Sequence, residues 1–250
     1  MSYYKLIIAY SGTAYHGWQQ QKDAVSVAGM LQARFKKTFG HDITLVGASR
    51  TDAGVHAMGQ VAVFKTEITI EPTIMMRAWN GCLPPDILIR SLDFAPEIFH
   101  PQRNVLEKTY YYHIFTQRPL PWFAPYGLYY YRPLDNQKLH DALQVFAGTH
   151  DFRSFCTGDD MECTIRTVNS LTFSYMKRYS MYRIIVKGPG FLRYMIRRMV
   201  GAAINVASTD IPVEKVTEVL EQKHPLHTLP TAPAHGLMLR KIIYTMDTHE

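Results

Sequence analysis

The sequence predicts an α+β fold in which a mostly antiparallel sheet carries helices on one side. Strand-like and helix-like segments interleave in the first half of the chain and again in the second half. Two apolar segments late in the chain are separated by a short polar turn, which is typical of a hairpin. Hydrophobic residues make up 47% of the 250 residues, enough for a packed core.

The first half alternates between the two kinds of element. Ser26 can cap the first helix, and Pro84 with Pro85 ends the second one. The expected strands are 4–10, 43–46, 61–65 and 87–94, and the expected helices are 27–39 and 73–82.

The second half repeats this mixed pattern without a clear flexible linker. Its most strongly predicted helix has apolar residues at helical spacing along one face. The expected strands are 107–115, 166–176, 181–187 and 237–244, and the expected helices are 135–146, 191–207 and 213–222. Residues 177–180 form the turn of the predicted hairpin.

The charge balance favours an anionic partner. Lys and Arg number 27 against 21 Asp and Glu, giving a net charge of +6 and a pI near 9.1. The same excess also serves solubility. No apolar run approaches the roughly 20 residues that a spanning helix needs, and the N-terminus does not read as a signal peptide.

The cysteines and histidines predict neither disulfides nor a metal site. Cys82, Cys156 and Cys163 are odd in number and lack zinc-ligand spacing, so reduced cytosol is the simplest compartment. His56 follows Asp52 by four residues, but no cluster of three or four ligands accompanies it. No phosphate-binding glycine loop is present, so we expect no cofactor.

The stretch GASRTDAGVHAMGQVAVF, 47–64, is the most informative part of the chain. Its small-residue turn places Arg50 and Asp52 between two apolar strands, as in a site built on a loop that a rigid sheet holds. A nearby cation favours the ionised carboxylate, so Arg50 can hold Asp52 ready as a nucleophile or a general base. The alternative is a structural turn with an Arg–Asp ion pair.

The second half carries basic and aromatic side chains that suit RNA. Arg193 and Arg197 share one flank of the predicted helix 191–207 and form either a solvated face or a phosphate or carboxylate clamp. In the strand 107–115, Tyr110 is predicted to share a face with Tyr112, while Tyr111 points the other way. Such rings either stack within the sheet or receive an unpaired base.

Several segments together resemble the tRNA pseudouridine synthase A (TruA) family, in family order from residue 10 to residue 202. The segments are YSGTAYHGWQQQ, RTDAGVH, WNGCLPPDI, FHPQRNVLEKTYYYHI and GFLRYMIRRMVGA. The resemblance implies the pseudouridine synthase fold, with two ferredoxin-like α+β halves, joined sheets and a basic cleft between them. We expect an N-terminal half, 1–104, with the aspartate loop and a C-terminal half, 105–250, with the tyrosine strand and arginine helix.

The resemblance also implies roles for single residues. Asp52 takes the position of the family nucleophile, and Arg197 that of an arginine that pairs with it beside Arg50. Tyr110 takes the position of the tyrosine that contacts the substrate, and Tyr112 is expected to pack in the core.

By this resemblance the chain isomerises uridine to pseudouridine at tRNA positions 38, 39 and 40 in the anticodon stem-loop, without a cofactor and as a homodimer. Asp52 attacks ring carbon 6 or sugar carbon 1′, or acts as a base. Two other classes stay open: a tRNA-binding module without catalysis, and a hydrolase that uses Asp52 and His56.

The chain departs from the family pattern at two positions. Gln102 stands where the family usually has Arg, with Arg103 next, so one RNA-backbone contact is expected to be shifted or lost. Ser11 stands where the family usually has Asp, outside the chemistry.

Overall fold

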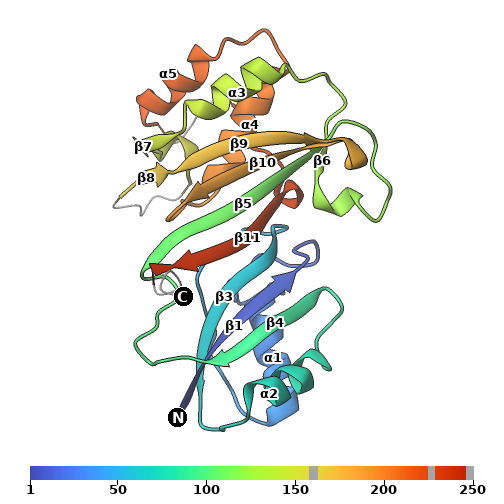
Figure 1. The fold of residues 1–250 in the computed structure, drawn as a ribbon, viewed down its shortest axis with the longest axis vertical. Helices are drawn as coiled ribbons and strands as arrows, with labels where there is room; N and C mark the ends of the chain where they lie inside the picture. Colours follow the sequence, from blue (N-terminus) through green and yellow to red (C-terminus); the bar gives the residue numbers. More distant parts are fainter. Residues whose placement is uncertain (158–162, 225–228, 246–250) are drawn as a thin grey trace. The chain divides into compact units, whose positions relative to one another are not determined.

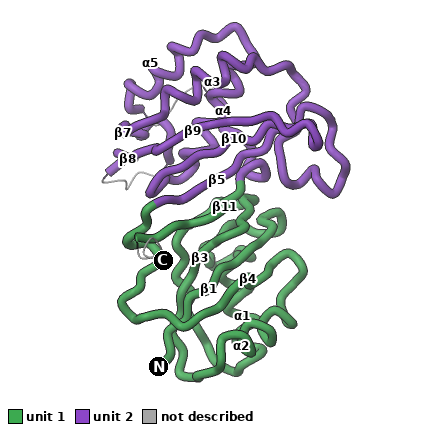
Figure 2. Tube along the Cα trace, viewed as in Figure 1, with its two compact units in different colours: residues 1–106, 238–250 green, residues 107–237 purple. Residues whose placement is uncertain are grey.

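The computed structural model describes residues 1–157, 163–224 and 229–245. The chain divides into two compact units, which Figure 2 shows in separate colours. Unit 1 consists of residues 1–106 and 238–250, and unit 2 consists of residues 107–237. The last strand of the chain therefore belongs to unit 1.

Unit 1 is a sheet with two helices (Figure 1). Its elements are β1 (Ser2–Tyr10), α1 (Val27–Phe39), β2 (Val46–Gly47), β3 (His56–Thr66), α2 (Pro72–Asn80), β4 (Ile87–Phe94) and β11 (Leu237–Tyr244). The strand order is β4-β1-β3-β11, and β2 pairs with β3. β1 is antiparallel to β3 and β4, whereas β11 runs parallel to β3.

The core of unit 1 lies between this sheet and its helices. Phe64 of β3 contacts Phe35 of α1 and Trp79 of α2, with ring centroids 5.4 and 5.6 Å apart. The Trp79 indole N–H donates to the carbonyl of Leu31, so this buried polar group is satisfied. These contacts fix both helices on one face of the sheet.

Unit 2 contains a second sheet with helices. Its elements are β5 (Val105–Phe115), η1 (Ala124–Tyr126), β6 (Leu128–Tyr129), α3 (Asn136–Gln144), β7 (Gly148–Asp151), η2 (Arg153–Phe155), β8 (Ile165–Val168), β9 (Ser170–Met176), η3 (Lys177–Tyr179), β10 (Met181–Gly188), α4 (Met195–Ala207), α5 (Glu214–Gln222) and η4 (Ala234–Gly236). The first two residues of β5 fall in unit 1.

The strands of unit 2 follow the order β5-β10-β9, with β6 on β5 and a separate β7–β8 pair. Tyr112 lies opposite Ile184, and Tyr110 lies opposite Val186, so all four point to one face. That face is buried: Tyr112, Ile184 and Val186 have no exposed area. α3 packs against both α4 and β9 on this side.

Most predicted elements are confirmed. The helix 27–39 and the strands 87–94 and 237–244 have the predicted bounds. Ser26 caps α1 by accepting the N–H of Gly29, and the hairpin of β9 and β10 turns at residues 177–180 as predicted. The mostly antiparallel α+β class is also confirmed. No helix within the described ranges has the length and apolar character to cross a membrane.

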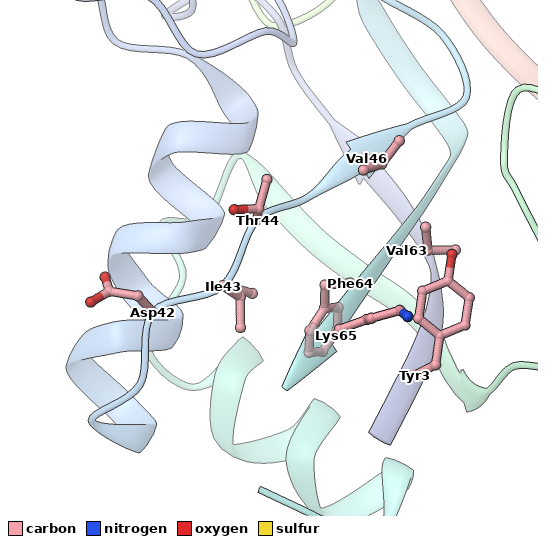
Figure 3. Close-up of a pocket in the computed structure, with 8 residues that line it drawn as sticks. All are labelled: Tyr3, Asp42, Ile43, Thr44, Val46, Val63, Phe64 and Lys65. Atoms are coloured by element: carbon pink, nitrogen blue, oxygen red, sulfur yellow. The ribbon is translucent and has the colours of Figure 1, made fainter. Parts of the chain in front are cut away.

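The predicted strand 43–46 is wrong except for its last residue. Ile43 and Leu45 are buried, which explains their apolar pattern, but the Leu45 N–H donates to the Gln32 side chain on α1 at 2.9 Å. A pocket of about 470 Å³ separates this segment from the end of β3 (Figure 3). Strand pairing therefore starts only at Val46.

Two predicted elements of the second half also need correction. The segment 166–176 is divided at Asn169, whose N–H donates to Lys187, so β8 pairs with β7 and β9 pairs with β10. The helix 191–207 begins only at Met195, because Tyr194 has a left-handed φ of 62°. Arg193 therefore precedes α4 instead of sharing a helical flank with Arg197.

Candidate active site

Asp52 lies on the loop that connects β2 with β3 in unit 1. Its side chain is partly exposed, and its carbonyl accepts the N–H of Val55 at 3.1 Å, which closes a turn. Gly54 within this turn has a φ of 79°, which suits glycine. The turn returns the chain directly into β3, so the carboxylate is presented at the start of a central strand.

The N-terminal segment that follows β1 holds this loop through its backbone. The Trp18 N–H donates to the carbonyl of Thr51 at 3.1 Å, and the Gly54 N–H donates to the carbonyl of Tyr15 at 3.2 Å. Gly17 lies against the same turn with a φ of 89°. A Cβ at Gly17 would collide with the carbonyl of Thr51, so the close approach depends on glycine.

Buried side chains fix the other side of the loop. Gln60 of β3 has no exposed area and bonds to both backbone groups of Ser49, at 3.2 and 2.6 Å. The Tyr10 and Thr51 hydroxyls are 2.8 Å apart. The residues before Asp52 are thereby held by a strand glutamine and a strand tyrosine, and a preorganised loop results.

His56 supports the same region from the first position of β3. It is 2% exposed, and its Nδ1 accepts the N–H of Gly12 at 3.0 Å. In the neutral ring the proton therefore sits on Nε2. Ser11, at the position where the family usually has Asp, lies 3.5 Å from the same Nδ1. His56 thus acts as a structural acceptor for the segment that covers the loop.

The segment WNGCLPPDI adds a second support to the N-terminal segment. The Tyr15 hydroxyl donates to the Asp86 carboxylate at 2.7 Å, and the Ser11 N–H donates to the Asp86 carbonyl at 2.9 Å. Burial raises the pKa of the Tyr15 hydroxyl, and the bond to Asp86 raises that pKa further. Asn80 at the end of α2 bonds to both backbone groups of Ile89.

Gln102 makes a backbone contact close to the loop. Its side-chain amide donates to the carbonyl of Gly47 at 2.8 Å. Gly47 is packed against the indole of Trp18, where a Cβ would collide with the ring. The residue that departs from the family pattern therefore supports the start of the aspartate loop.

Arg50 lies two residues before Asp52, and its side chain is exposed. It belongs with Asp52 to unit 1, whereas the predicted site residues Tyr110 and Arg197 belong to unit 2. An ion pair between Arg50 and Asp52 stays a prediction.

Tyr110 lies on β5 and is 8% exposed. The ring of Phe191 meets it edge-on, with centroids 5.5 Å apart. Tyr112 is fully buried and donates its hydroxyl to the carbonyl of Pro233 at 2.9 Å, so its predicted packing role is confirmed. Burial raises the pKa of the Tyr112 hydroxyl. The positive charge of Arg197 lowers this pKa by a smaller amount.

Arg197 lies on the first turns of α4 and is tied to the segment that precedes β11. Its Nε donates to the carbonyl of Ala232 at 2.9 Å, and the Ala232 N–H donates to the Arg197 carbonyl at 3.0 Å. The guanidinium groups of Arg197 and Arg193 lie 4.8 and 5.1 Å from the ring centroid of Tyr194. The two arginines thus share one aromatic ring, although they do not share a helix.

Two neighbours of Arg197 were not predicted from the sequence. Burial lowers the pKa of His235, and the charge of Arg197 lowers it further. Arg198, by contrast, donates to the carbonyls of Cys156 and Ser154 at 2.6 and 3.3 Å, a structural use of its charge. Within the described residues, no group of three or more His, Cys, Asp or Glu is arranged to hold a metal ion.

The chain is similar to known proteins over almost its whole length. The family described as tRNA pseudouridine synthase matches residues 6–102 and 142–245. The tRNA pseudouridine synthase A of Thermodesulfovibrio yellowstonii is 36% identical, covering 96% of this chain and 98% of the relative. That of Thermoanaerobacter pseudethanolicus is 38% identical over 96% and 98%. That of Streptococcus equi subsp. equi is 36% identical over 98% and 99%.

Proposed function

The chain belongs to the tRNA pseudouridine synthase family and is an isomerase that converts uridine to pseudouridine in tRNA; on this premise we propose that Asp52 is the nucleophile. One observation supports this role above the others. The backbone before and after Asp52, at Thr51 and Gly54, is hydrogen-bonded to residues 15–18, while Asp52 itself stays partly exposed. A rigid, accessible carboxylate suits covalent catalysis.

Apart from this carboxylate, the reaction requires few chemical groups from the protein. Pseudouridine formation breaks the bond between ribose carbon 1′ and uracil nitrogen 1, turns the ring, and joins carbon 1′ to ring carbon 5. The hydrogen at carbon 5 leaves to solvent as the ring is restored, so no redox partner or energy source is needed. Asp52 attacks ring carbon 6 or carbon 1′, or takes a proton as a base, and all three routes require it ionised.

Arg50 and Arg197 are proposed to keep Asp52 ionised, since a nearby cation lowers a carboxylate pKa. For Arg197 the bonds to Ala232 and the contact with Tyr194 support a fixed guanidinium. Tyr110 is proposed to contact the substrate uracil. In this assignment the N-terminal half, 1–104, supplies the nucleophile, and the C-terminal half, 105–250, supplies Tyr110 and Arg197.

The substrate is proposed to be the anticodon stem-loop, at tRNA positions 38, 39 and 40, bound by a homodimer in the cytoplasm. The target base must leave its stack, which costs a few kcal/mol. Contacts to phosphates supply that energy, consistent with the net charge of +6. No cofactor takes part in this scheme.

The test is release of tritium from tRNA labelled at carbon 5 of uracil. Wild type, Asp52→Ala and Asp52→Asn are compared, and tRNA binding is measured for each. We expect release by wild type, none by either variant, and affinities within about threefold of one another. Release by either variant would overturn the assignment of Asp52 as nucleophile.

The two other classes make different predictions in the same assay. A tRNA-binding module gives tight binding without release in wild type, and an Asp–His hydrolase liberates free base and depends on His56. No observation favours the hydrolase, because the Nδ1 of His56 already accepts the Gly12 N–H.

A further inference from the structure

Unit 2 displays a group of aromatic side chains on its surface that the proposed chemistry does not use. Trp122, Phe123 and Tyr179 are 64%, 43% and 40% exposed. Their rings form an edge-to-face series, with centroids 6.3 Å apart for Trp122 and Phe123 and 6.4 Å apart for Phe123 and Tyr179. The Arg178 guanidinium lies 5.7 Å from the ring centroid of Tyr179. These four residues are called the aromatic platform.

The platform is built from two segments that hydrogen bonds hold together. Trp122 and Phe123 lie in the loop between β5 and β6, and Arg178 and Tyr179 lie in the turn between β9 and β10 (Figure 1). Both the N–H and the hydroxyl of Thr116 donate to the carbonyl of Ser180 at 2.9 Å. The two segments that carry the exposed rings are therefore joined next to the turn between β9 and β10.

A series of contacts within unit 2 connects the aromatic platform with Arg197. η1, which directly follows Phe123, contacts η4, the turn at residues 234–236. The residues before η4 include Ala232, which binds Arg197 at both its backbone groups. The platform is thus structurally continuous with the segment that holds Arg197.

The two segments that carry the platform contain charges of one sign only. Segments 116–127 and 175–180 contain Arg118, Lys177 and Arg178, all exposed, and neither contains an Asp or a Glu. Exposed aromatic rings interleaved with cations are the pattern by which proteins hold unpaired nucleotides, because every base can stack and every phosphate attracts a cation.

A second copy of the chain is a less suitable partner for this surface. A twofold interface centred on this surface would bring the same patch of two subunits together, so the cations Arg118, Lys177 and Arg178 would meet a second patch of the same sign. Like charges brought together without acidic partners oppose association. The charge therefore favours a polyanion.

We propose that the aromatic platform stacks an unpaired nucleotide of the substrate tRNA other than the uridine that reacts. This inference rests on the proposed function, since it takes tRNA as the substrate. It assigns Trp122, Phe123 and Tyr179 to the base of this nucleotide and Arg178 to a neighbouring phosphate. The platform then raises affinity for tRNA without taking part in the bond changes at Asp52.

The test uses the full chain and an unmodified tRNA transcript. Trp122→Ala combined with Phe123→Ala should weaken tRNA binding and raise KM by about 5- to 100-fold, as expected for lost base stacking, with kcat within about twofold of wild type. Trp122→Phe should keep most of the affinity. Phe94→Ala is the matched control, because Phe94 is 54% exposed beside Asp93, outside the platform, and should leave binding unchanged.

Arg178→Ala tests the phosphate contact separately. Its removal should lower the slope of log Kd against log salt concentration by about one, whereas the aromatic variants should shift affinity at constant slope. Sedimentation of each variant shows whether self-association changes.

The outcomes separate the inference from the proposed function. Unchanged tRNA affinity in the double variant would overturn the proposed role of the aromatic platform. The same conclusion would follow if the variant dissociated into monomers and its subunits bound tRNA normally. Absence of tritium release from wild type would overturn the proposed function, while the binding comparison would still report on the platform. Thermal unfolding near that of wild type shows that a loss of affinity is local.

Discussion

The backbone N–H of Trp18 donates a 3.1 Å hydrogen bond to the carbonyl of Thr51, the residue before Asp52. Trp18 is 1% exposed and its indole packs against Gly47, so the N-terminal segment and the aspartate loop form one body. The position of Asp52 is therefore set by residues far away in the sequence.

Substitution of Gly17 should disturb the reaction through the backbone. In Gly17→Ala the new methyl group meets the carbonyl of Thr51, and the φ of 89° becomes unfavourable. We expect kcat to fall by tenfold or more and the free energy of unfolding to fall by about 2–4 kcal/mol. Tritium release at saturating tRNA and urea unfolding measure the two effects.

Gly40→Ala separates backbone strain from displacement of the loop. Gly40 has a φ of 76° at the end of α1, and a Cβ there meets nothing within 4 Å. This control should lose about 1–2 kcal/mol of stability and keep its kcat. Equal kcat values in the two variants would show that the approach of Gly17 to Thr51 does not position Asp52.

His56 is predicted to matter for the acceptor that it offers to Gly12 and not for proton transfer. The Oδ1 of an asparagine takes nearly the place of the imidazole Nδ1, so His56→Asn should keep kcat within about fivefold. His56→Leu leaves the buried Gly12 N–H without its acceptor and should cost about 1–3 kcal/mol of stability. Loss of activity in both variants, with normal stability in His56→Asn, would point to a chemical role.

The aspartate loop could be predicted because the residues that define it are consecutive in the sequence. The residues 50–54 combine a cation, a carboxylate and a glycine in one turn between apolar segments, and the structure places this turn between β2 and β3. The supports of the loop could not be predicted in the same way. Gln60 reads as an ordinary polar residue of a strand, yet it is fully buried and binds Ser49.

The start of α4 at Met195 could not be predicted for a similar reason. The apolar periodicity runs back to Leu192, but helical spacing does not report the backbone angle of Tyr194. A left-handed φ costs energy in a tyrosine, and the sequence carries no sign of it, although the ring of this residue lies against the guanidinium groups of Arg193 and Arg197. The strand predicted at 43–46 failed because burial of Ile43 and Leu45 mimics a strand pattern.

The ring of Tyr194 is predicted to position Arg197. Tyr194→Gly removes the ring and relieves the left-handed φ, so stability should change by less than about 1 kcal/mol. Activity should fall by about 2- to 30-fold, the equivalent of one lost cation–π contact. Tyr194→Phe keeps the ring and should keep the activity. The measurement is kcat/KM for tRNA in both variants.

Lys223→Gly is the control for this change, because Lys223 also has a left-handed φ, 49°, at the end of α5. It should not alter activity. If Tyr194→Gly matched Lys223→Gly in kcat/KM, the contact between Tyr194 and Arg197 would have no role in the reaction.

Lys108 of β5 should make the stability of the protein depend on pH. Burial lowers the pKa of its ammonium group from the ordinary 10.5 to about 8. Between these two values the unfolded chain binds more protons than the folded one, so the contribution of Lys108 to stability rises with pH. Below about pH 8 the residue is charged in both states, and the cost of burying that charge is fully present.

Lys108→Met removes this cost and keeps the length of the side chain. At pH 7 the variant should be more stable than wild type by about 1–3 kcal/mol, and the difference should shrink steadily as the pH rises from 8 to 10. Urea unfolding of both proteins across this range measures it, with Lys187→Met as control, because Lys187 pairs with Glu107 at 3.6 Å and is 40% exposed. A constant difference over the whole range would mean that the ammonium of Lys108 is solvated in the folded protein.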